Sequence, residues 1–501
     1  MSAAEALALG KSRSAPKAVP AGVPAAAPAP ADTTTTTTDT KSTPTSSINI
    51  VILGGNFAGL GVLHTLARHT IPALQHLSSQ TTSSSTQYQI TLITPNTQFL
   101  FVPASPRALI QPDLLPGGEA KVFRPLSDAV KQYGDLVKLK QAYAYAVDRT
   151  NRRVHIRHVN SHWSGDGMLV PPEAASTVSY DVLVIATGTK ARSALWSMPG
   201  PGSEALKGAE EATRREWESI RNKLRNLQSG AHEHHDVLIA GGGPVGVETA
   251  GEVASWLKAE GKTEGVKITL HSGADKLLKR NCGEGLGRKA EEYLRRQFGG
   301  LVEVVHGGVK IVSVSESGPE AGDGEGETTV QLSDGSTRTV ALYIDATGGQ
   351  GNADAFLPKT WLDGSNRVVT KDAFFRVRGS SESDPEAGGI YAAGDVVSGS
   401  DNTLIETNFQ VPVVCSSIGA DLASQILGPD SQKNGVKLPA PLKQKTFKNK
   451  LAGTLLIPIG PGGGVGQILG WGVPSFLVKV AKAKTFMVDM AEPAVTGQQW
   501  K

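Results

Sequence analysis

The feature that most constrains this chain is a glycine-rich turn that follows a short apolar stretch. Residues 236–248 read Asp-Val-Leu-Ile-Ala-Gly-Gly-Gly-Pro-Val-Gly-Val-Glu, with glycines at positions Gly241, Gly243 and Gly246. This spacing is typical of a dinucleotide-binding turn. The first glycine permits the tight turn, the second admits a pyrophosphate to the backbone, and the third lets the helix pack on the strand. The N–H groups that begin the helix then favour the negative phosphates.

A degenerate copy of the turn lies upstream, at Ile50–Gly59, with Asn56 where the second glycine is expected. Asparagine tolerates left-handed backbone angles better than most residues. We therefore expect this turn to form as well, and the Asn56 side chain to be free to bond a phosphate. The alternative is a helix-capping asparagine in a turn that binds nothing. Two turns in one chain predict two nucleotides, one held as a prosthetic group and one exchanged as a substrate.

Composition narrows the class of protein. A chain of 501 residues with 39% hydrophobic residues and 57 glycines fits a globular α/β protein of roughly three domains. The formal charge of +3 lacks the clustered basic face that nucleic acid requires, so no nucleic-acid partner is expected. Cys282 and Cys415 are the two cysteines, too far apart in sequence for a disulfide framework, a redox pair or a cysteine-rich metal site. No apolar run is long enough to span a bilayer, and we expect a cytoplasmic protein.

The order of strands, turns and helices predicts an α/β fold. It consists of two nested Rossmann-like dinucleotide-binding domains, with parallel sheets and a β-meander, followed by a C-terminal α+β cap. Separate strands are expected at Leu136–Leu139 and Tyr143–Asp148, and the helix after the first turn is expected to end near Arg68. The expected parts are a disordered Ala/Pro/Thr-rich tail (1–47), the first domain (48–208), the inserted second domain (209–350), the return to the first domain (351–430) and the cap (431–501).

Three further motifs follow in order: Ala186-Thr187-Gly188, Ala346-Thr347-Gly348 and Ala393-Gly394-Asp395. With the two turns, they resemble the two-dinucleotide-domain flavoproteins of the pyridine nucleotide–disulfide oxidoreductase-like superfamily, without the redox cysteine pair. Within that superfamily the chain looks closest to the apoptosis-inducing-factor-like group, which includes ferroptosis suppressor protein and its fungal homologues. That narrower likeness rests on Pro103–Leu109, on the second turn and on the ending Gly453–Ile468.

The resemblance implies FAD in the first domain and NADH or NADPH, as a co-substrate, in the second. Arg107 would contact the flavin nucleotide, although a surface arginine is the alternative. Asp395 would bond the ribityl chain, although a simple helix cap is the alternative. The residues implied for FAD are Gly54, Gly55, Asn56, Phe57, Ala58, Gly59, Arg107, Ala144, Gly188, Gly394 and Asp395. Those implied for NAD(P)H are Gly241, Gly243, Gly246, Glu248 and Gly348.

Both domains depart from the usual pattern at the strand after the turn, where an acidic residue normally binds the ribose. The first domain has Thr94-Pro95-Asn96 there, so Thr94 or Asn96 would have to substitute. The second has His271-Ser272-Gly273, followed by the cations Lys276, Lys279 and Arg280. With no acid to repel a 2′-phosphate, we expect either NADH or NADPH to be used.

The function implied is hydride transfer from NAD(P)H to FAD, and then electron transfer to a quinone-like or other small acceptor. The C-terminal segment carries Trp471, Phe476, Leu477 and Val478 among the lysines Lys479, Lys482 and Lys484. This pattern is typical of peripheral membrane contact, at a lipid droplet or mitochondrial surface, and equally of a packed cap helix. A different class remains open: a cell-death interaction protein that holds FAD and uses reduced nucleotide as a conformational signal.

Overall fold

The computed structural model describes residues 46–81, 86–159, 162–163, 169–170, 174–198, 209–228, 234–279, 284–317, 326–379, 388–428 and 437–500. Contacts join residues 44–501 into one compact unit. Apart from Ser46 and Ser47, the predicted disordered tail lies outside the described residues.

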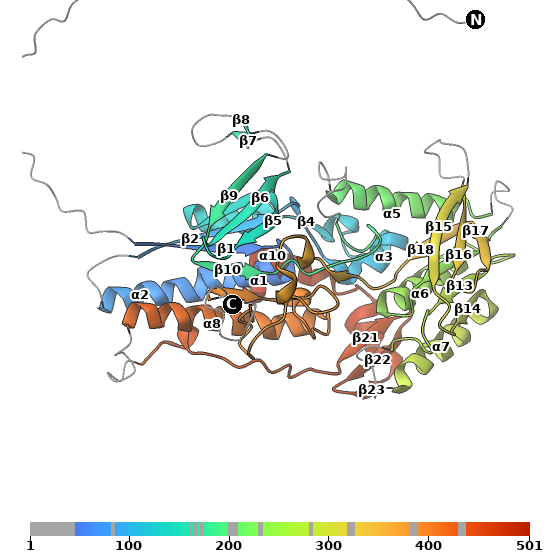
Figure 1. The fold of residues 1–501 in the computed structure, drawn as a ribbon. Helices are drawn as coiled ribbons and strands as arrows, with labels where there is room; N and C mark the ends of the chain where they lie inside the picture. Colours follow the sequence, from blue (N-terminus) through green and yellow to red (C-terminus); the bar gives the residue numbers. More distant parts are fainter. Residues whose placement is uncertain are drawn as a thin grey trace, which may run out of the picture. The chain divides into compact units, whose positions relative to one another are not determined.

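A seven-stranded sheet carries the first turn (Figure 1). Its central strands are continuous apolar runs buried on both faces, as parallel strands covered by helices are. The last strand in sequence, β20, pairs with β10, so the chain returns to this sheet after a long excursion. The order is β20 (Ile390–Ala392), β10 (Val182–Ile185), β1 (Ser46–Leu53), β2 (Thr86–Thr94), β5 (Val137–Asp148), β6 (Arg153–His158) and β9 (Ala175–Ser179).

The strand β5 corrects the prediction of two separate strands. It runs without a break, pairing parallel with β2 up to Gln141 and antiparallel with β6 from Ala142. The residues Lys140-Gln141-Ala142 contain no glycine, proline or other turn former, so nothing interrupts the extended backbone. The predicted meander is therefore an extension of the parallel sheet.

The second turn lies on a smaller parallel sheet (Figure 1). Helices α6 (Pro244–Ala259) and α7 (Glu284–Phe298) belong to the same region. The sheet order is β14 (Val302–Val305), β13 (Ile268–His271), β12 (Val237–Ala240) and β18 (Leu342–Asp345). An antiparallel sheet follows in sequence, formed by β15 (Ile311–Ser317), β16 (Glu327–Leu332) and β17 (Thr337–Val340).

The helix after the first turn is longer than predicted. Helix α1 (Phe57–Thr65) continues through a π-helical turn, Leu66–Thr70, into α2 (Ile71–Thr81). Pro72 lies in the first turn of α2, where a missing N–H is tolerated. Buried leucines continue beyond it, so the apolar face does not end at Arg68.

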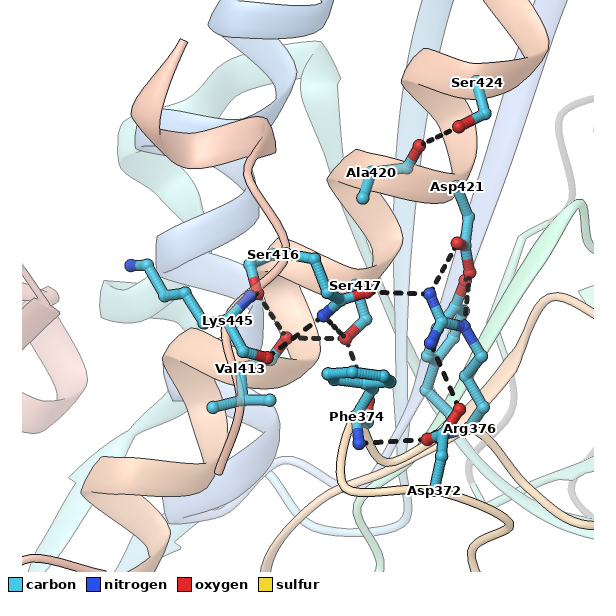
Figure 2. A network of polar contacts seen from close by, with 12 residues as sticks. Asp372, Phe374, Arg376, Val413, Ser416, Ser417, Ala420, Asp421, Ser424 and Lys445 are labelled. Atoms are coloured by element: carbon cyan, nitrogen blue, oxygen red, sulfur yellow. Dashed lines mark hydrogen bonds and ion pairs between the residues drawn. The ribbon is translucent and has the colours of Figure 1, made fainter. Parts of the chain in front are cut away.

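A polar network anchors the long helix α8 (Leu404–Leu427) (Figure 2). The Arg376 guanidinium donates to both carboxylate oxygens of Asp421, at 2.8 and 2.6 Å, and also pairs with Asp372. The Tyr391 hydroxyl donates to the same Asp421 carboxylate at 2.6 Å. Because Tyr391 lies in β20, the network fixes this strand, and the Gly394 turn after it, against α8.

The C-terminal segment consists of short elements that contact α1 of the first region and α6 and α7 of the second. Its strands form one antiparallel sheet, and no helix in the described part of the chain is both long and apolar enough to cross a membrane. The elements are β21 (Leu455–Pro458), β22 (Gly464–Ile468), β23 (Trp471–Val473), α9 (Ser475–Val478), a π-helical turn (Lys479–Ala483) and α10 (Ala491–Thr496). The remaining elements are β3 (Gln98–Leu100), α3 (Ser105–Ile110), β4 (Phe123–Pro125), α4 (Leu126–Val130), β7 (His162–Trp163), β8 (Leu169–Val170), β11 (Thr189–Lys190), α5 (Ala209–Arg225) and β19 (Gln350–Gly351).

Candidate functional site

The first glycine turn is closed by backbone contacts that admit no side chain. Gly54 has φ +110°, and a Cβ there would lie 2.3 Å from the Ala186 carbonyl oxygen. A Cβ on Gly59 would lie 1.8 Å from the Gly54 carbonyl oxygen. Both positions therefore require glycine, because any larger residue would force the strand and the helix apart.

The second turn repeats this geometry. Gly241 has φ +118°, and its Cβ would lie 2.4 Å from the Ala346 carbonyl oxygen. A Cβ on Gly246 would lie 1.8 Å from the Gly241 carbonyl oxygen. The two turns are thus built in the same way, each closed by the strand that carries the next motif in its own domain.

The middle position is where the turns differ. Gly243 has φ −80°, and a Cβ there would meet nothing within 4 Å, so this glycine leaves open space in front of helix α6. Asn56 has φ −104°, an angle open to any residue, so the left-handed conformation we expected is wrong. Its amide donates to the Leu100 carbonyl oxygen at 3.2 Å, which turns the side chain towards the protein.

The motif glycines of the later segments differ in what a side chain there would meet. Cβ atoms on Gly188 or Gly348 would meet nothing within 4 Å. Gly394 has φ +82°, and its Cβ would lie 2.6 Å from that of Ala58, so this turn packs directly on the first glycine turn. Asp395 follows it, half-buried, and its carbonyl oxygen accepts from Arg367 at 3.0 Å.

The guanidinium of Arg107 is paired with a carboxylate of the protein and is not free to bind a phosphate. It is fully buried in α3 and forms a two-pronged ion pair with Glu252 of α6, with one N–O distance of 2.9 Å. It also donates to the Ala483 carbonyl oxygen at 3.1 Å and lies over the Phe486 ring, 4.8 Å from its centroid. Neither the predicted phosphate contact nor the surface alternative describes this position.

Glu248 is likewise paired within the chain. It lies buried in α6, one helical turn before Glu252, and its carboxylate accepts from Lys482 at 2.6 Å. Lys482 also donates to the Leu456 carbonyl oxygen at 3.2 Å. Burial raises the pKa of Glu248 above its ordinary value, and the nearby Lys482 opposes that shift. Burial also raises the pKa of Glu252, opposed by Arg107.

Sequence reasoning missed this buried cluster of four charges. Glu252 follows Glu248 by four residues, the spacing that places two side chains on one helix face, and that signal was available. The partners were not predictable, because Arg107 and Lys482 come from segments more than a hundred residues away on either side.

Several buried oxygens near the first turn lack a partner among the described residues. They belong to Asn56, Asn96, Thr187 and Asn352. Buried polar atoms are nearly always bonded in native proteins, so they mark where a polar ligand fits. The ribose and ribityl hydroxyls of FAD could donate to these oxygens, so the residues that carry them fit that cofactor, whereas Arg107 is already paired with Glu252. Ala144, also implied for FAD, lies half-buried in β5, paired with Ile156.

At the second turn, the strand end contains no carboxylate. His271 is buried, which lowers its pKa, and Ser272 donates to the Lys276 carbonyl oxygen at 3.1 Å. Lys279 is exposed and pairs with Asp275 at 2.8 Å, while Arg280 lies outside the described residues. The choice between NADH and NADPH thus stays a prediction.

Two glycine turns of one geometry, each after a parallel strand in its own sheet, are typical of a protein that binds two dinucleotides. The profile of the pyridine nucleotide-disulphide oxidoreductase family matches residues 48–414. The chain therefore belongs to this family of oxidoreductases. Its cofactors are FAD and, as co-substrate, NADH or NADPH.

Similar proteins include the oxidoreductase phnG of Penicillium herquei, which is 30% identical, with 91% of this chain and 98% of that protein covered. The external alternative NAD(P)H-ubiquinone oxidoreductase B3 of Arabidopsis thaliana is 25% identical. The matched region covers 70% of this chain and 55% of that protein. Among solved structures, NDH2 of Plasmodium falciparum in complex with NADH has the same fold. The TM-score is 0.55 at 17% identity, with 89% of this chain and 97% of that one covered.

Proposed function

We propose that this chain transfers electrons from NAD(P)H through FAD to a quinone-like acceptor, as a member of the apoptosis-inducing-factor-like part of its family. The observation that carries the proposal is the contrast between the middle positions of the two turns. Asn56 is bonded into the protein, as suits a retained prosthetic group, whereas Gly243 leaves open space, as suits a nucleotide that comes and goes.

The chain's own residues bind and orient. Bound FAD would supply the redox chemistry, accepting hydride and passing electrons on. The backbone N–H groups after Gly54 and after Gly241 would hold the two pyrophosphates, and Asp395 would bond the ribityl chain. Lys482 and Arg107 neutralise the two buried carboxylates on α6, so that helix can lie against the flavin domain without an uncompensated charge.

The acceptor is proposed from chemistry and from relatives. Cys415 is buried on α8, where burial raises its pKa, and the sequence contains no closely spaced cysteine pair of the kind that accepts electrons from a flavin. The Arabidopsis relative is named for ubiquinone. A diffusible quinone accepts electrons without a covalent partner in the protein, so a quinone acceptor requires no cysteine pair.

We further propose that the C-terminal segment meets a membrane surface, placing a cytoplasmic protein on a lipid droplet or mitochondrial surface. Trp471, Val480 and Phe476 are 81, 74 and 63% exposed, the highest values among the large apolar side chains described. Core packing explains Val478, which is buried, but not these three. The exposed Lys479 and Lys484 beside them would favour anionic lipid.

Steady-state turnover with NADH and NADPH against a panel of quinones tests the activity. We expect oxidation of the nucleotide that depends on the quinone and saturates with it. A reduced flavin that persists in the presence of every quinone would instead favour the cell-death interaction protein.

Vesicle flotation tests the membrane contact. The double variant Trp471→Ser with Val480→Ser should release the protein from anionic vesicles. Val312→Ser, on an edge strand of the antiparallel sheet and 62% exposed, is the matched control and should change nothing. Equal flotation of all three proteins would contradict the contact.

A further inference from the structure

The end of strand β2 lies against the first glycine turn. The Gly54 amide donates to the Ile93 carbonyl oxygen at 2.9 Å. A Cβ on Gly55 would lie 2.9 Å from the Thr94 side chain, so the turn and the strand end are in contact. The Asn96 backbone N–H donates to the Thr94 hydroxyl oxygen at 3.3 Å, which holds Asn96 close to this contact. In dinucleotide-binding folds, the residue that binds the ribose hydroxyls is found at the end of this strand.

The side chain of Asn96 has a buried oxygen with no partner among the described residues. An acceptor that loses water and gains no donor destabilises the fold, so such an atom indicates a missing partner. A ribose hydroxyl is a donor of the right kind. Thr94 is a poorer candidate, because its hydroxyl oxygen already has a partner, the Asn96 backbone N–H, whereas the Asn96 side-chain oxygen has none among the described residues.

We propose that Asn96 binds the ribose hydroxyls of the adenosine half of FAD, in place of the acidic residue usual at this position. The inference rests on the proposed role of the first turn as the FAD site. The Asn96 oxygen accepts from a hydroxyl, as a carboxylate would. The neutral amide adds no negative charge beside the pyrophosphate.

A carboxylate from another element is the competing candidate. The Thr97 hydroxyl donates to Glu210 of α5 at 3.1 Å, which brings that acid to the residue next to Asn96. Glu210 is therefore the control position: if the ribose is bound by an acid after all, this one supplies it.

The experiment measures FAD binding to the deflavinated full chain by fluorescence quenching, without NAD(P)H. Two ligands are compared: FAD, and an FAD analogue whose adenosine lacks both ribose hydroxyls. Asn96→Leu should weaken FAD binding roughly three- to tenfold, the effect of one lost hydrogen bond, and leave analogue binding unchanged. Asn96→Asp keeps an acceptor oxygen at this position and should bind FAD at least as tightly as the wild type does. Glu210→Gln should match the wild type for both ligands.

Equal weakening of both ligands by Asn96→Leu would show a structural role and overturn the inference. So would unchanged FAD binding, or a hydroxyl-dependent loss in Glu210→Gln. Thermal unfolding of each variant confirms that it folds. A wild-type chain that binds no FAD would overturn the proposed function as well, whereas the other outcomes leave that function intact.

Discussion

The two glycine turns share their closing contacts and differ where the ligand enters. The first and third glycines of each turn face the protein's own backbone, at nearly the same distances in both. The middle position differs: Gly243 leaves open space in one turn, whereas the Asn56 side chain bonds the Leu100 carbonyl oxygen in the other. Protein contacts thus require glycine at the first and third positions of both turns. The middle position is not constrained in this way, so its residue can differ with the ligand and with how tightly the ligand is held.

The helices after the two turns are also held differently. The C-terminal residues 494–500 pack along α1, where His64 donates through Nε2 to the Val495 carbonyl oxygen and accepts through Nδ1 from the Tyr133 hydroxyl. The Trp500 ring covers Gly61, where a Cβ would lie 2.7 Å from it. Helix α6 is held instead by buried ion pairs, including that of Glu248 with Lys482. The first helix is thus held by packing and by hydrogen bonds to carbonyl oxygens, and the second by ion pairs.

The largest expected effect comes from filling the open position of the second turn. Gly243→Trp meets no protein atom at its Cβ, so the fold should survive while the space for the nucleotide is lost. We expect the rate of NAD(P)H oxidation to fall by about a hundredfold or more, with FAD content and thermal stability near the wild type. Loss of FAD in this variant would mean that the two turns have been assigned to the wrong nucleotides.

Removal of Lys482, the cation that pairs with a buried carboxylate of α6, should cost stability. Lys482→Met leaves the buried Glu248 without its partner, and the free energy of unfolding should fall by about 3 kcal/mol. Burial already raises the pKa of Glu248, so the folded state holds its proton at a higher pH than the unfolded state does. The loss should therefore grow as the pH rises above the ordinary value for glutamate. Lys479→Met, at an exposed neighbour, is the control for chemical denaturation.

The stability contributed by His64 of α1 should depend on pH in the opposite direction. Burial lowers the pKa of His64 from 6.5 to about 4, so its folded-state contribution is present at neutral pH and lost as the pH falls through that range. At most about 3 kcal/mol of stability is involved. Denaturation curves at several pH values should show a weaker acid dependence in His64→Gln. The same acid dependence of stability in His64→Gln and in the wild type would show that His64 does not stabilise the fold in this way.

The smallest effect is expected from restoring the missing glycine. Asn56→Gly removes the bond to the Leu100 carbonyl oxygen and should cost about 1 kcal/mol of stability. FAD should still bind, because the first and third glycines close the turn. A variant that cannot retain FAD would show that Asn56 itself is a principal ligand.

Much of the fold was predictable because its signals are local. Apolar runs that end in glycine predicted the parallel strands, and the return to the first sheet is observed in β20. The errors have physical causes. β5 continues through Lys140–Ala142 because no turn former stops it. α1 continues into α2 through a π-helical turn that ends two residues before Pro72, so this proline does not end the helix.

The site was predictable only where backbone geometry decides it. Spacing alone located Gly54, Gly59, Gly241 and Gly246, and the structure shows why no other residue fits there. The side-chain partners were not accessible in this way. Arg107 finds Glu252, and Glu248 finds Lys482, through contacts between segments that are distant in sequence.

The most direct test of the central claim, that the first turn retains FAD and the second exchanges NAD(P)H, is anaerobic rapid mixing of the purified protein with NAD(P)H. The account predicts that the protein is yellow, that its flavin absorbance bleaches with a rate that saturates with nucleotide, and that Gly243→Trp stays yellow without bleaching. A colourless protein that remains so after FAD is added, or a Gly243→Trp variant that bleaches as fast as the wild type, would contradict it.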